Sequence, residues 1–476
     1  LPLTHMISCG NQSVLSLEDF VEHLIDHPAV RAIGMHIEGL RDVPRFAKAA
    51  VRAMHKGIPL VALKTGSSSI GAALTVSHTG SLSGTDDLYD ALFARVGVIR
   101  VKSPSELLET LKFLSIAGVP HGNRVAGFTC SGGGATMLAD HAETIGLSFP
   151  AFDAVAGADL ASLLPSIATV SNPLDYTTPI WGDPARTGPV FASAITGIRA
   201  DVAVLVQDYP LAGLDESRRY YLADAEAFIL AAKARGIPAA ICATLPENLD
   251  AATREWLVSR NVAPMQGLTE TLNALRDAIW WGARRSQIVA NPPASLLNMA
   301  PVAAIHVLGE AKGKDLLRQF GLPVPDGEVV AGRDVTASAA RLGYPVALKM
   351  LGPRLVHKSD AGAVAIGLGD EASLSRALDK MRADVRRHDL DAVTDQFLVE
   401  RMAPRPLAEL LVNLRRDAQF GLVLTLGSGG VLVELLDDAA TLLLPADDAE
   451  ILNALTGLKV SRLLDGFRGK VRADLP

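Results

Sequence analysis

The chain has 476 residues and a formal net charge of −7, and 49% of its residues are hydrophobic whereas only 5% are aromatic. This length is too great for one core and predicts about three domains. The acidic balance argues against a general nucleic-acid-binding protein, which needs a basic face.

The cysteines and the hydropathy pattern indicate a cytoplasmic protein that has no membrane partner. Cys9, Cys130 and Cys242 are far apart and odd in number, so they predict neither a disulfide framework nor a CxxC metal site. No charged segment followed by an apolar one opens the chain. The longest uncharged stretch, residues 287–309, contains three prolines and therefore predicts a linker instead of a transmembrane helix.

The first part of the chain alternates between apolar runs and amphipathic segments. Strands are predicted within residues 29–39, 58–66 and 98–101, and helices within residues 43–57, 85–97 and 104–115. The first strand is expected to end at Glu38, and Gly57 is expected to close the first helix. Because strands and helices alternate, we expect a parallel sheet with helices on both faces.

The same alternation restarts near residue 123 and continues to about residue 287. Strands are predicted at residues 123–130, 202–208 and 237–243, and helices at residues 135–146 and 221–236. Past the proline-rich linker, residues 310–325 open a third unit, with predicted strands at residues 344–350, 397–402, 409–416 and 420–427. Strand runs with few helices predict a mixed, largely antiparallel sheet of the α+β kind for this unit.

A glycine-rich turn, Ser131 to Gly134, directly follows a predicted strand and precedes a predicted helix. Glycines let backbone N–H groups approach an anion, and a helix N-terminus adds partial positive charge, so the turn predicts a phosphate cradle. The alternative is a turn that is glycine-rich only for packing. Since it lacks the Lys-Ser/Thr ending of a P-loop and the spacing of a dinucleotide fingerprint, it does not predict an NAD site.

Charged residues in the third unit interrupt otherwise apolar strands. Lys349 lies in YPVALKM and Glu400 in LVERM, while HKSD adds His357 and Lys358 in a polar loop. Lys349 is either a strand-end lysine that reaches solvent or a lysine that reaches nucleotide phosphates. A glutamate between apolar residues is costly unless something binds it.

His78 stands alone in the polar loop VSHTGSLSG, residues 76–84. An isolated histidine in such a loop is usually solvated or hydrogen-bonded to a nearby carbonyl. The loop alone therefore does not indicate a function.

Taken together, these segments resemble the nucleoside-diphosphate-forming acyl-CoA synthetases, relatives of succinyl-CoA synthetase. The resemblance follows the family order along the whole chain, and its segments are residues 61–101, 128–147, 171–176, 316–325, 343–350, 355–368, 398–402, 415–439 and 463–470. It implies an α/β fold with two flavodoxin-like parallel-sheet domains followed by an α+β ATP-grasp domain. The expected boundaries are 1–118, 119–287, a linker at 288–300, and 301–476.

The resemblance also implies roles for individual residues. By motif, His78 takes a phosphoryl group and carries it between two sites, and Glu38 orients the imidazole and supports its charge. Glycines around the loop, at positions 66, 71, 80 and 84, would serve as hinges. The remaining family positions are the phosphate cradle Ser131, Gly132, Gly133 and Gly134; the ATP contacts Lys349, Lys358, Glu400, Gly429, Gly430 and Glu434; and a possible relay, His357.

The acid substrate is expected beside the SNPLDY motif. Asn172, Asp175, Tyr176 and Trp181 are the candidate contacts, and the two aromatic residues stand where smaller ones are more usual in the family. They predict a pocket for an aromatic acid, by stacking, or for a cationic acid, by cation–π contact. The alternative is that the two rings pack a domain edge.

The resulting hypothesis is an acid–CoA ligase that uses ATP, CoA and Mg²⁺ and releases ADP. The CoA-binding domain of the family would precede the chain, and the segment with its magnesium ligands would follow it. We therefore expect the middle of a longer, homo-oligomeric protein, with no metal ligands in this part. Ala363 also replaces a glycine that is common in the family. The alternatives are the synthetase-like regulatory region of a protein acetyltransferase, and a non-catalytic scaffold.

Overall fold

The computed structural model describes residues 2–67, 86–210, 213, 216–297, 307–355, 357–430, 438–469 and 471–475. The chain forms two compact units, and each has its own core. The first unit comprises Leu1–Met299, Leu411–Gly427 and Asp438–Leu458. The second comprises Ala300–Leu410, Ser428–Asp437 and Lys459–Pro476.

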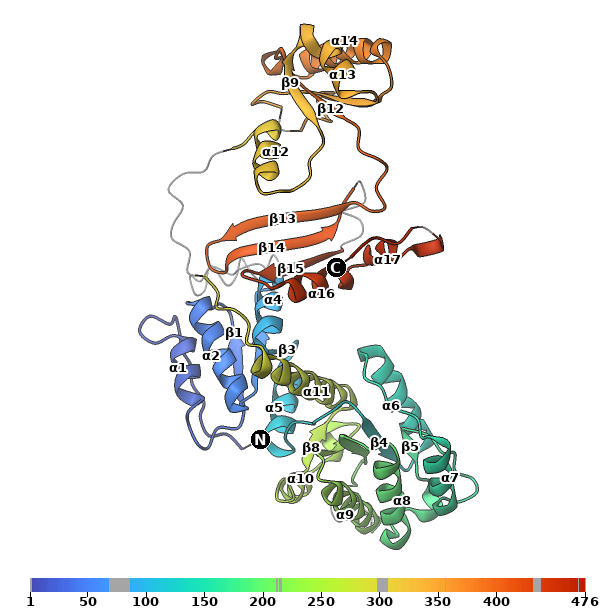
Figure 1. The fold of residues 1–476 in the computed structure, drawn as a ribbon. Helices are drawn as coiled ribbons and strands as arrows, with labels where there is room; N and C mark the ends of the chain where they lie inside the picture. The colour runs from blue at the N-terminus through green and yellow to red at the C-terminus, as the bar shows by residue number, and fades with distance from the viewer. Residues whose placement is uncertain are drawn as a thin grey trace. The chain divides into compact units, whose positions relative to one another are not determined.

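The first sheet of the first unit is parallel, in the order β1-β2-β3 (Figure 1). Its strands are β1 (Ile33–Ile37), β2 (Leu60–Lys64) and β3 (Ile99–Val101), and its helices are α1 (Leu17–Leu24), α2 (Val43–Lys56), α4 (Asp86–Val96) and α5 (Pro104–Ile116). The Asp42 side chain caps α2 by accepting the Arg45 N–H, and Gly57 ends that helix at φ +74°. The predicted strands and helices of this region are confirmed, although β1 ends one residue before Glu38.

The second sheet is also parallel, in the order β5-β4-β6-β7-β8. Its strands are β4 (Val125–Thr129), β5 (Leu174–Asp175), β6 (Val202–Val206), β7 (Ala239–Ala243) and β8 (Ala263–Gln266). The helices are α6 (Gly132–Ile145), α7 (Ala154–Leu163), α8 (Pro184–Gly197), α9 (Arg218–Arg235), α10 (Ala251–Val258) and α11 (Leu268–Ala290). This flavodoxin-like order reverses direction between β4 and β6, and such sheets bind ligands beyond the carboxyl ends of the strands at that point.

Helices cover both faces of the second sheet, as predicted. One face packs against α7, α8, α9 and α10 around a core that contains Phe128, Phe191 and Phe228. The other face packs against α5, α6 and α11, and the same core includes Val61 of β2 and Val101 of β3. Since α5 contributes to that core, the two parallel sheets share one hydrophobic layer.

The sheet of the second unit is antiparallel, in the order β11-β10-β12-β9. Its strands are β9 (Gly327–Ala331), β10 (Val346–Met350), β11 (Val364–Leu368) and β12 (Gln396–Arg401), and its helices are α12 (Glu310–Gln319), α13 (Val335–Leu342) and α14 (Glu371–His388). Leu348, Met350 and Phe397 are fully buried beneath α13 and α14. This sheet confirms the α+β prediction.

A further sheet, β13-β14-β15, packs in the first unit although it comes late in the sequence. It consists of β13 (Leu410–Asp417), β14 (Gly421–Ser428) and β15 (Ala439–Leu443), followed by α16 (Asp448–Gly457) and α17 (Ser461–Leu464). The Phe420 ring lies edge-on to Tyr89 of α4, with 5.2 Å between the ring centroids. Figure 1 shows α4 next to β15. Part of the segment predicted as the last domain thus shares a core with the first sheet.

Short 3₁₀ turns connect several of these elements: Thr178–Ile180, Pro246–Asn248, Gly332–Asp334, Leu390–Ala392 and Phe467–Gly469. In the described part of the chain, every helix is either too short or too polar to cross a membrane.

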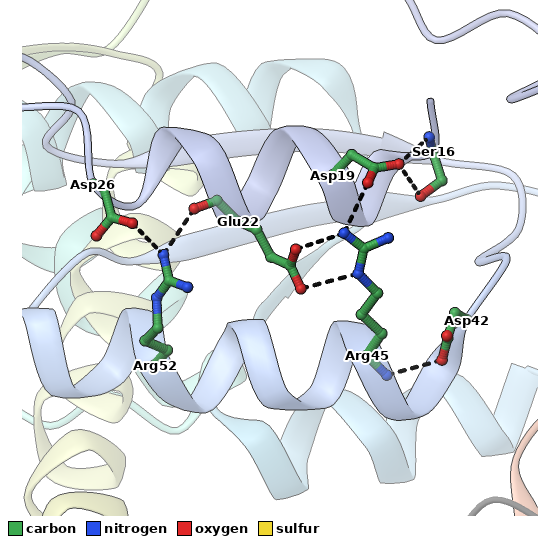
Figure 2. Close-up of polar contacts among 7 residues, drawn as sticks. All are labelled: Ser16, Asp19, Glu22, Asp26, Asp42, Arg45 and Arg52. Carbon is green, nitrogen blue, oxygen red and sulfur yellow. Dashed lines mark hydrogen bonds and ion pairs between the residues drawn. The ribbon is translucent and has the colours of Figure 1, made fainter. Parts of the chain in front are cut away.

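Ion pairs join α1 to α2 at the surface (Figure 2). The Arg45 guanidinium contacts Asp19 Oδ1 at 2.7 Å and Glu22 Oε2 at 2.6 Å. The N–H of Ser16, together with Arg45, lowers the pKa of Asp19 to about 2. Two turns further along α2, Arg52 donates to Asp26 and to the Glu22 carbonyl. These contacts hold α1 in place beside the loop that follows β1.

Candidate active site

The carboxyl edge of the first sheet brings together two parts of the predicted phosphohistidine site. Glu38 follows β1 directly, and the segment that carries His78 leaves from β2. Because Ile37 pairs with Lys64 in the parallel ladder, Glu38 and the start of that segment lie at the same edge. His78 itself and the glycines at 71, 80 and 84 lie outside the described residues, so the predicted pairing of His78 with Glu38 stays a prediction.

The loop that begins with Glu38 is held from two helices. The buried Glu18 of α1 accepts the N–H groups of Arg41 and Asp42 at 2.9 and 3.0 Å. The Tyr89 hydroxyl of α4 accepts the Leu40 N–H at 3.1 Å. These three bonds fix the backbone just after Glu38.

Lys64 was not predicted, although its position is informative. Its side chain is buried at the end of β2, where it donates to the Thr65 carbonyl and lies 4.6 Å from the centroid of the Tyr89 ring. Burial lowers the pKa of Lys64, and the Asp86 carboxylate opposes that shift. A lysine at the end of an apolar strand is the same pattern that singled out Lys349, so the sequence did contain this information.

The predicted phosphate cradle forms the first turn of α6. Ser131 caps the helix, since its Oγ accepts the Gly134 N–H at 3.4 Å. Ser131, Gly132 and Gly133 are exposed, so the amides at this helix start face solvent. A Cβ on Gly134 would lie 2.7 Å from Thr129 Oγ1, which explains why that position needs glycine. The turn can thus receive an anion at a helix N-terminus.

The SNPLDY residues occupy different environments. The Asn172 side chain accepts the Gly127 N–H and donates to the carbonyls of Val125 and Pro150, so backbone groups use its amide fully. Tyr176 is completely buried, and its ring packs edge-on against Phe191. Both side chains are thus engaged with the protein itself in this structure, and their predicted contact with the acid stays a prediction.

Asp175 and Trp181 are better placed for a ligand. Asp175 Oδ2 lies 3.5 Å from the position of a Cβ on Gly132, so its carboxylate borders the cradle. Trp181 is half-buried and lies against Tyr221 and Tyr220, with ring centroids 4.8 and 5.4 Å apart. Its Nε1 is buried without a hydrogen-bond partner among the described residues.

In the second unit, the predicted ATP residues form a cluster of lysines and glutamates. Lys349 Nζ lies 2.5 Å from Glu310 Oε1 and 2.8 Å from Glu400 Oε2. Lys314 contacts both glutamates, and Lys358 contacts Glu310. The three ammonium groups outnumber the two carboxylates, so the cluster carries a net positive charge that suits phosphates.

The charges in this cluster depend on each other. Burial opposes ionisation of Glu310, but hydrogen bonds from Lys349, Lys358 and Lys314 outweigh it and lower its pKa to about 2. Burial likewise opposes the charge on Lys349, whereas Glu310 and Glu400 raise its pKa above the usual value. Glu400 is only 3% exposed, and its contacts with Lys314 and Lys349 balance the cost of burying a carboxylate in an apolar strand.

Glu310 and Lys314 were not predicted as site residues. They lie one turn apart at the start of α12, and their spacing is that of an ordinary helix-surface ion pair. Only the tertiary structure brings them to Lys349 on β10.

The other predicted ATP residues are nearby in sequence or only partly described. His357 is exposed and directly precedes Lys358. The Gly429 N–H donates to the Glu409 carbonyl at 2.7 Å, and Gly430 has φ +83°. Glu434 lies outside the described residues. Ala363 is fully buried in the core, so a methyl group is accommodated where the family often has glycine.

A metal site does not emerge from the described side chains, among which no three histidines, cysteines, aspartates or glutamates cluster closely enough to hold an ion.

Comparison with known proteins covers the whole chain. Residues 1–114 match the model of the succinyl-CoA ligase like flavodoxin domain, and residues 300–476 match the model of an ATP-grasp domain. A trans-feruloyl-CoA synthase from an unknown prokaryotic organism is 28% identical over 100% of this chain and 66% of its own length. An ADP-forming acetate–CoA ligase of Archaeoglobus fulgidus is 30% identical over 99% of this chain and 67% of its own length.

A solved structure shows the same fold. The dinucleotide-forming acetyl-coenzyme A synthetase 1 of Ca. Korarchaeum cryptofilum, in complex with phosphate and ADP, aligns with a TM-score of 0.52 and 21% identity. The alignment covers 60% of this chain and 61% of that chain. Among the two curated relatives described above, the chain covers about two thirds of each relative's own length. On this similarity in sequence, domain order and fold, the chain belongs to the ADP-forming acyl-CoA synthetase family.

Proposed function

We propose that the chain is the phosphohistidine-bearing and ATP-binding part of an ADP-forming acid–CoA ligase. The observation that carries this proposal is the cluster of Lys314, Lys349 and Lys358 in one unit, whose net positive charge would suit nucleotide phosphates. The other unit carries an anion cradle at the start of α6. A ligase that moves a phosphoryl group between two sites needs both.

Three steps complete the proposed reaction. A ring nitrogen of His78 attacks the γ-phosphorus of ATP, and ADP leaves. A carboxylate oxygen of the acid then attacks the phosphohistidine, which gives an acyl phosphate and returns the neutral imidazole. The CoA thiol attacks the acyl carbon, loses its proton, and displaces phosphate.

Residues of this chain support these steps in distinct ways. Lys349 and Lys358 would neutralise the phosphates of ATP, and Glu38 would hold the imidazole and stabilise its charge. The cradle amides at Gly132 and Gly133 would bind the phosphoryl group as it reaches the acid. Mg²⁺ would accompany the nucleotide, as it does in phosphoryl transfer generally. His357 is retained as a possible relay, and no residue of this chain is assigned to CoA.

We place the enzyme in the cytoplasm and expect a homo-oligomer of the longer chain. The three cysteines are unpaired, and Cys242 is fully buried, which fits a reducing compartment. The expected domain boundaries, 1–118, 119–287 and 301–476, are retained as proposals.

Labelling of the phosphohistidine tests the reaction. Full-length protein incubated with γ-labelled ATP should retain label that is acid-labile and base-stable, as a phosphoramidate is. His78→Ala should abolish both the label and acyl-CoA formation, whereas His388→Ala, an exposed position at the end of α14, should change neither. A His78→Ala enzyme that forms acyl-CoA at the wild-type rate would refute the mechanism.

An aromatic carboxylic acid is the substrate class that we propose. Trp181 lies among tyrosines at the end of the sheet that bears the cradle, and Arg219 lies 4.8 Å from the Tyr220 ring centroid. An arginine at this position disfavours a cationic acid, and one relative is named a feruloyl-CoA synthase. Trp181→Ala should raise KM for ferulate and leave KM for acetate unchanged, and the matched control is Trp280→Ala on α11. Equal KM values for ferulate in both variants would contradict the proposal.

A further inference from the structure

The backbone of Thr177 is unusual for its residue type. Its φ of +66° and ψ of +150° lie in a region that favours glycine, and threonine is β-branched. The other non-glycine residues with positive φ in the described part are Gln12, Arg199, Asn261 and Arg468, none of which is β-branched. Thr177 is only 8% exposed, and its Oγ1 has no partner among the described residues. Its conformation is therefore imposed by its surroundings.

One buried carboxylate holds the segment at both ends. Asp224 of α9 is fully buried and accepts the Tyr176 hydroxyl at 3.1 Å and the Gly182 N–H at 3.0 Å. The Thr187 hydroxyl of α8 donates to it as well, at 3.1 Å. Tyr176 and Gly182 flank the segment 177–181, so Asp224 fixes its two ends relative to α8 and α9.

Close packing leaves the segment little freedom. Gly182 has φ +77°, and a Cβ there would lie 2.6 Å from Tyr220 side-chain atoms. On the other side, Asp175 Oδ1 accepts the Thr177 N–H at 2.9 Å. The segment is thus tied to β5, α8 and α9 at once, and it ends at Trp181.

The segment begins beside the cradle. Asp175 of β5 pairs with Thr129 of β4 in the parallel ladder, and Thr129 lies two residues before Ser131. The cradle and the segment therefore leave the same sheet edge from adjacent strands. If the carboxylate of an acid binds at the cradle, the rest of the acid would lie against this segment.

We propose that Thr177 to Gly182 is the specificity-determining segment for the acid, and that Asp224 is the positioning residue that keeps it in its strained conformation. The strain matters because a relaxed segment would no longer present Trp181 at a fixed place. This inference rests on the proposed ligase function for the identity of the ligand. It goes beyond that function by assigning acid selectivity to residues that need not touch the acid.

Two measurements on variants of the full-length protein test this proposal together: the affinity for the acid and the melting temperature. The variants are Thr177→Gly, which removes the strain because glycine adopts positive φ freely, and Asp224→Asn, which keeps the shape of the side chain. The exposed Asp159→Asn on α7 is the control. Titration calorimetry with ferulate, benzoate and acetate measures binding without turnover, and label from γ-labelled ATP measures the phosphohistidine separately.

We expect Thr177→Gly to keep or raise the melting temperature while it weakens binding of the preferred acid about tenfold, the scale of a small misfit in a pocket. Asp224→Asn should weaken acid binding similarly, and both variants should keep full phosphohistidine label. Unchanged acid affinities in both variants would overturn the proposal. So would a fall in melting temperature for Thr177→Gly, or a loss of label equal to the loss of acid binding, since either result indicates a purely structural role. Absence of label in the wild-type protein would instead refute the ligase function, and the binding data would still decide the inference.

Discussion

Replacement of Arg95 by alanine should loosen β15 and α16 from the first sheet. Arg95 belongs to α4, and its side chain is only 5% exposed. Its guanidinium donates to the carbonyls of Leu443 at 2.9 Å and Ala294 at 3.0 Å, as well as to that of Pro445. The carboxylate of Glu450 lies 3.4 Å away. One side chain thus joins α4 to three separate segments of the chain.

The structure sets the size of the effect. A hydrogen bond from a charged donor contributes about 1.5–3 kcal/mol, and Arg95 makes three to carbonyls. Burial of the guanidinium opposes these gains, as the lowered pKa of Arg95 shows. Removal of one partner from a buried charged group costs about 3–5 kcal/mol, and we expect the lower end here because water can reach the vacated site. About 3 kcal/mol corresponds to roughly a hundredfold loss of protection from amide exchange.

Hydrogen–deuterium exchange, read by mass spectrometry on peptides that cover β15 and α16, measures this loss directly. Arg95→Lys should show an intermediate loss, because a compact ammonium group cannot reach all three carbonyls. Arg124→Ala, which removes an exposed pair with Asp201, is the control and should leave these peptides unchanged. If Arg95→Ala left exchange in β15 at the wild-type rate, the anchoring role would be refuted.

Three further predictions concern other parts of the chain. Gly134→Ala should destabilise the protein and reduce acyl-CoA formation, because its methyl group would meet Thr129, whereas Gly133→Ala should fold with a wild-type melting temperature, since its nearest neighbour would be 3.7 Å away. Lys349→Met should weaken ATP binding by calorimetry about 30-fold, as expected for loss of one charge-assisted contact of about 2 kcal/mol, and retained affinity would exclude it from the site. Burial raises the pKa of Asp277 to about 6, so the folded state holds this proton at pH values where the unfolded state has lost it. Its contribution to stability is full below about pH 4 and falls as the pH rises toward 6, and Asp277→Asn should remove this part of the pH dependence in denaturant titrations.

The sequence predicted most of the elements that depend on local pattern. The helix that ends at Gly57 and the strands around Val61 and Val204 were identified because period and capping are properties of neighbouring residues. Lys349 and Glu400 were identified because a charge in an apolar strand is costly, and the structure shows what balances it: each contacts the other.

Features that depend on contacts between segments far apart in the sequence were not predicted. Asp224 lies in an alanine-rich helix, and no local pattern distinguishes it from a surface aspartate. Asn172 and Tyr176 were assigned to the substrate from the family motif. A strand as short as β5 does not indicate which way its side chains point, and the structure shows Tyr176 in the core and Asn172 bonded to backbone groups. Strands β13 and β14 of the late sheet were predicted, whereas β15 was not. The core that this sheet shares with α4 depends on the contact between Phe420 and Tyr89, which lie far apart in the sequence.

Lys64 and Lys349 show how the same local pattern leads to different electrostatics. Each is a lysine at or next to the carboxyl end of a buried strand. Lys349 has two carboxylates in contact, and its pKa is raised despite burial. Lys64 has only an aromatic ring and a carbonyl as described contacts, and burial lowers its pKa. A negative charge brought next to Lys64 would raise its pKa, as Glu310 and Glu400 do for Lys349.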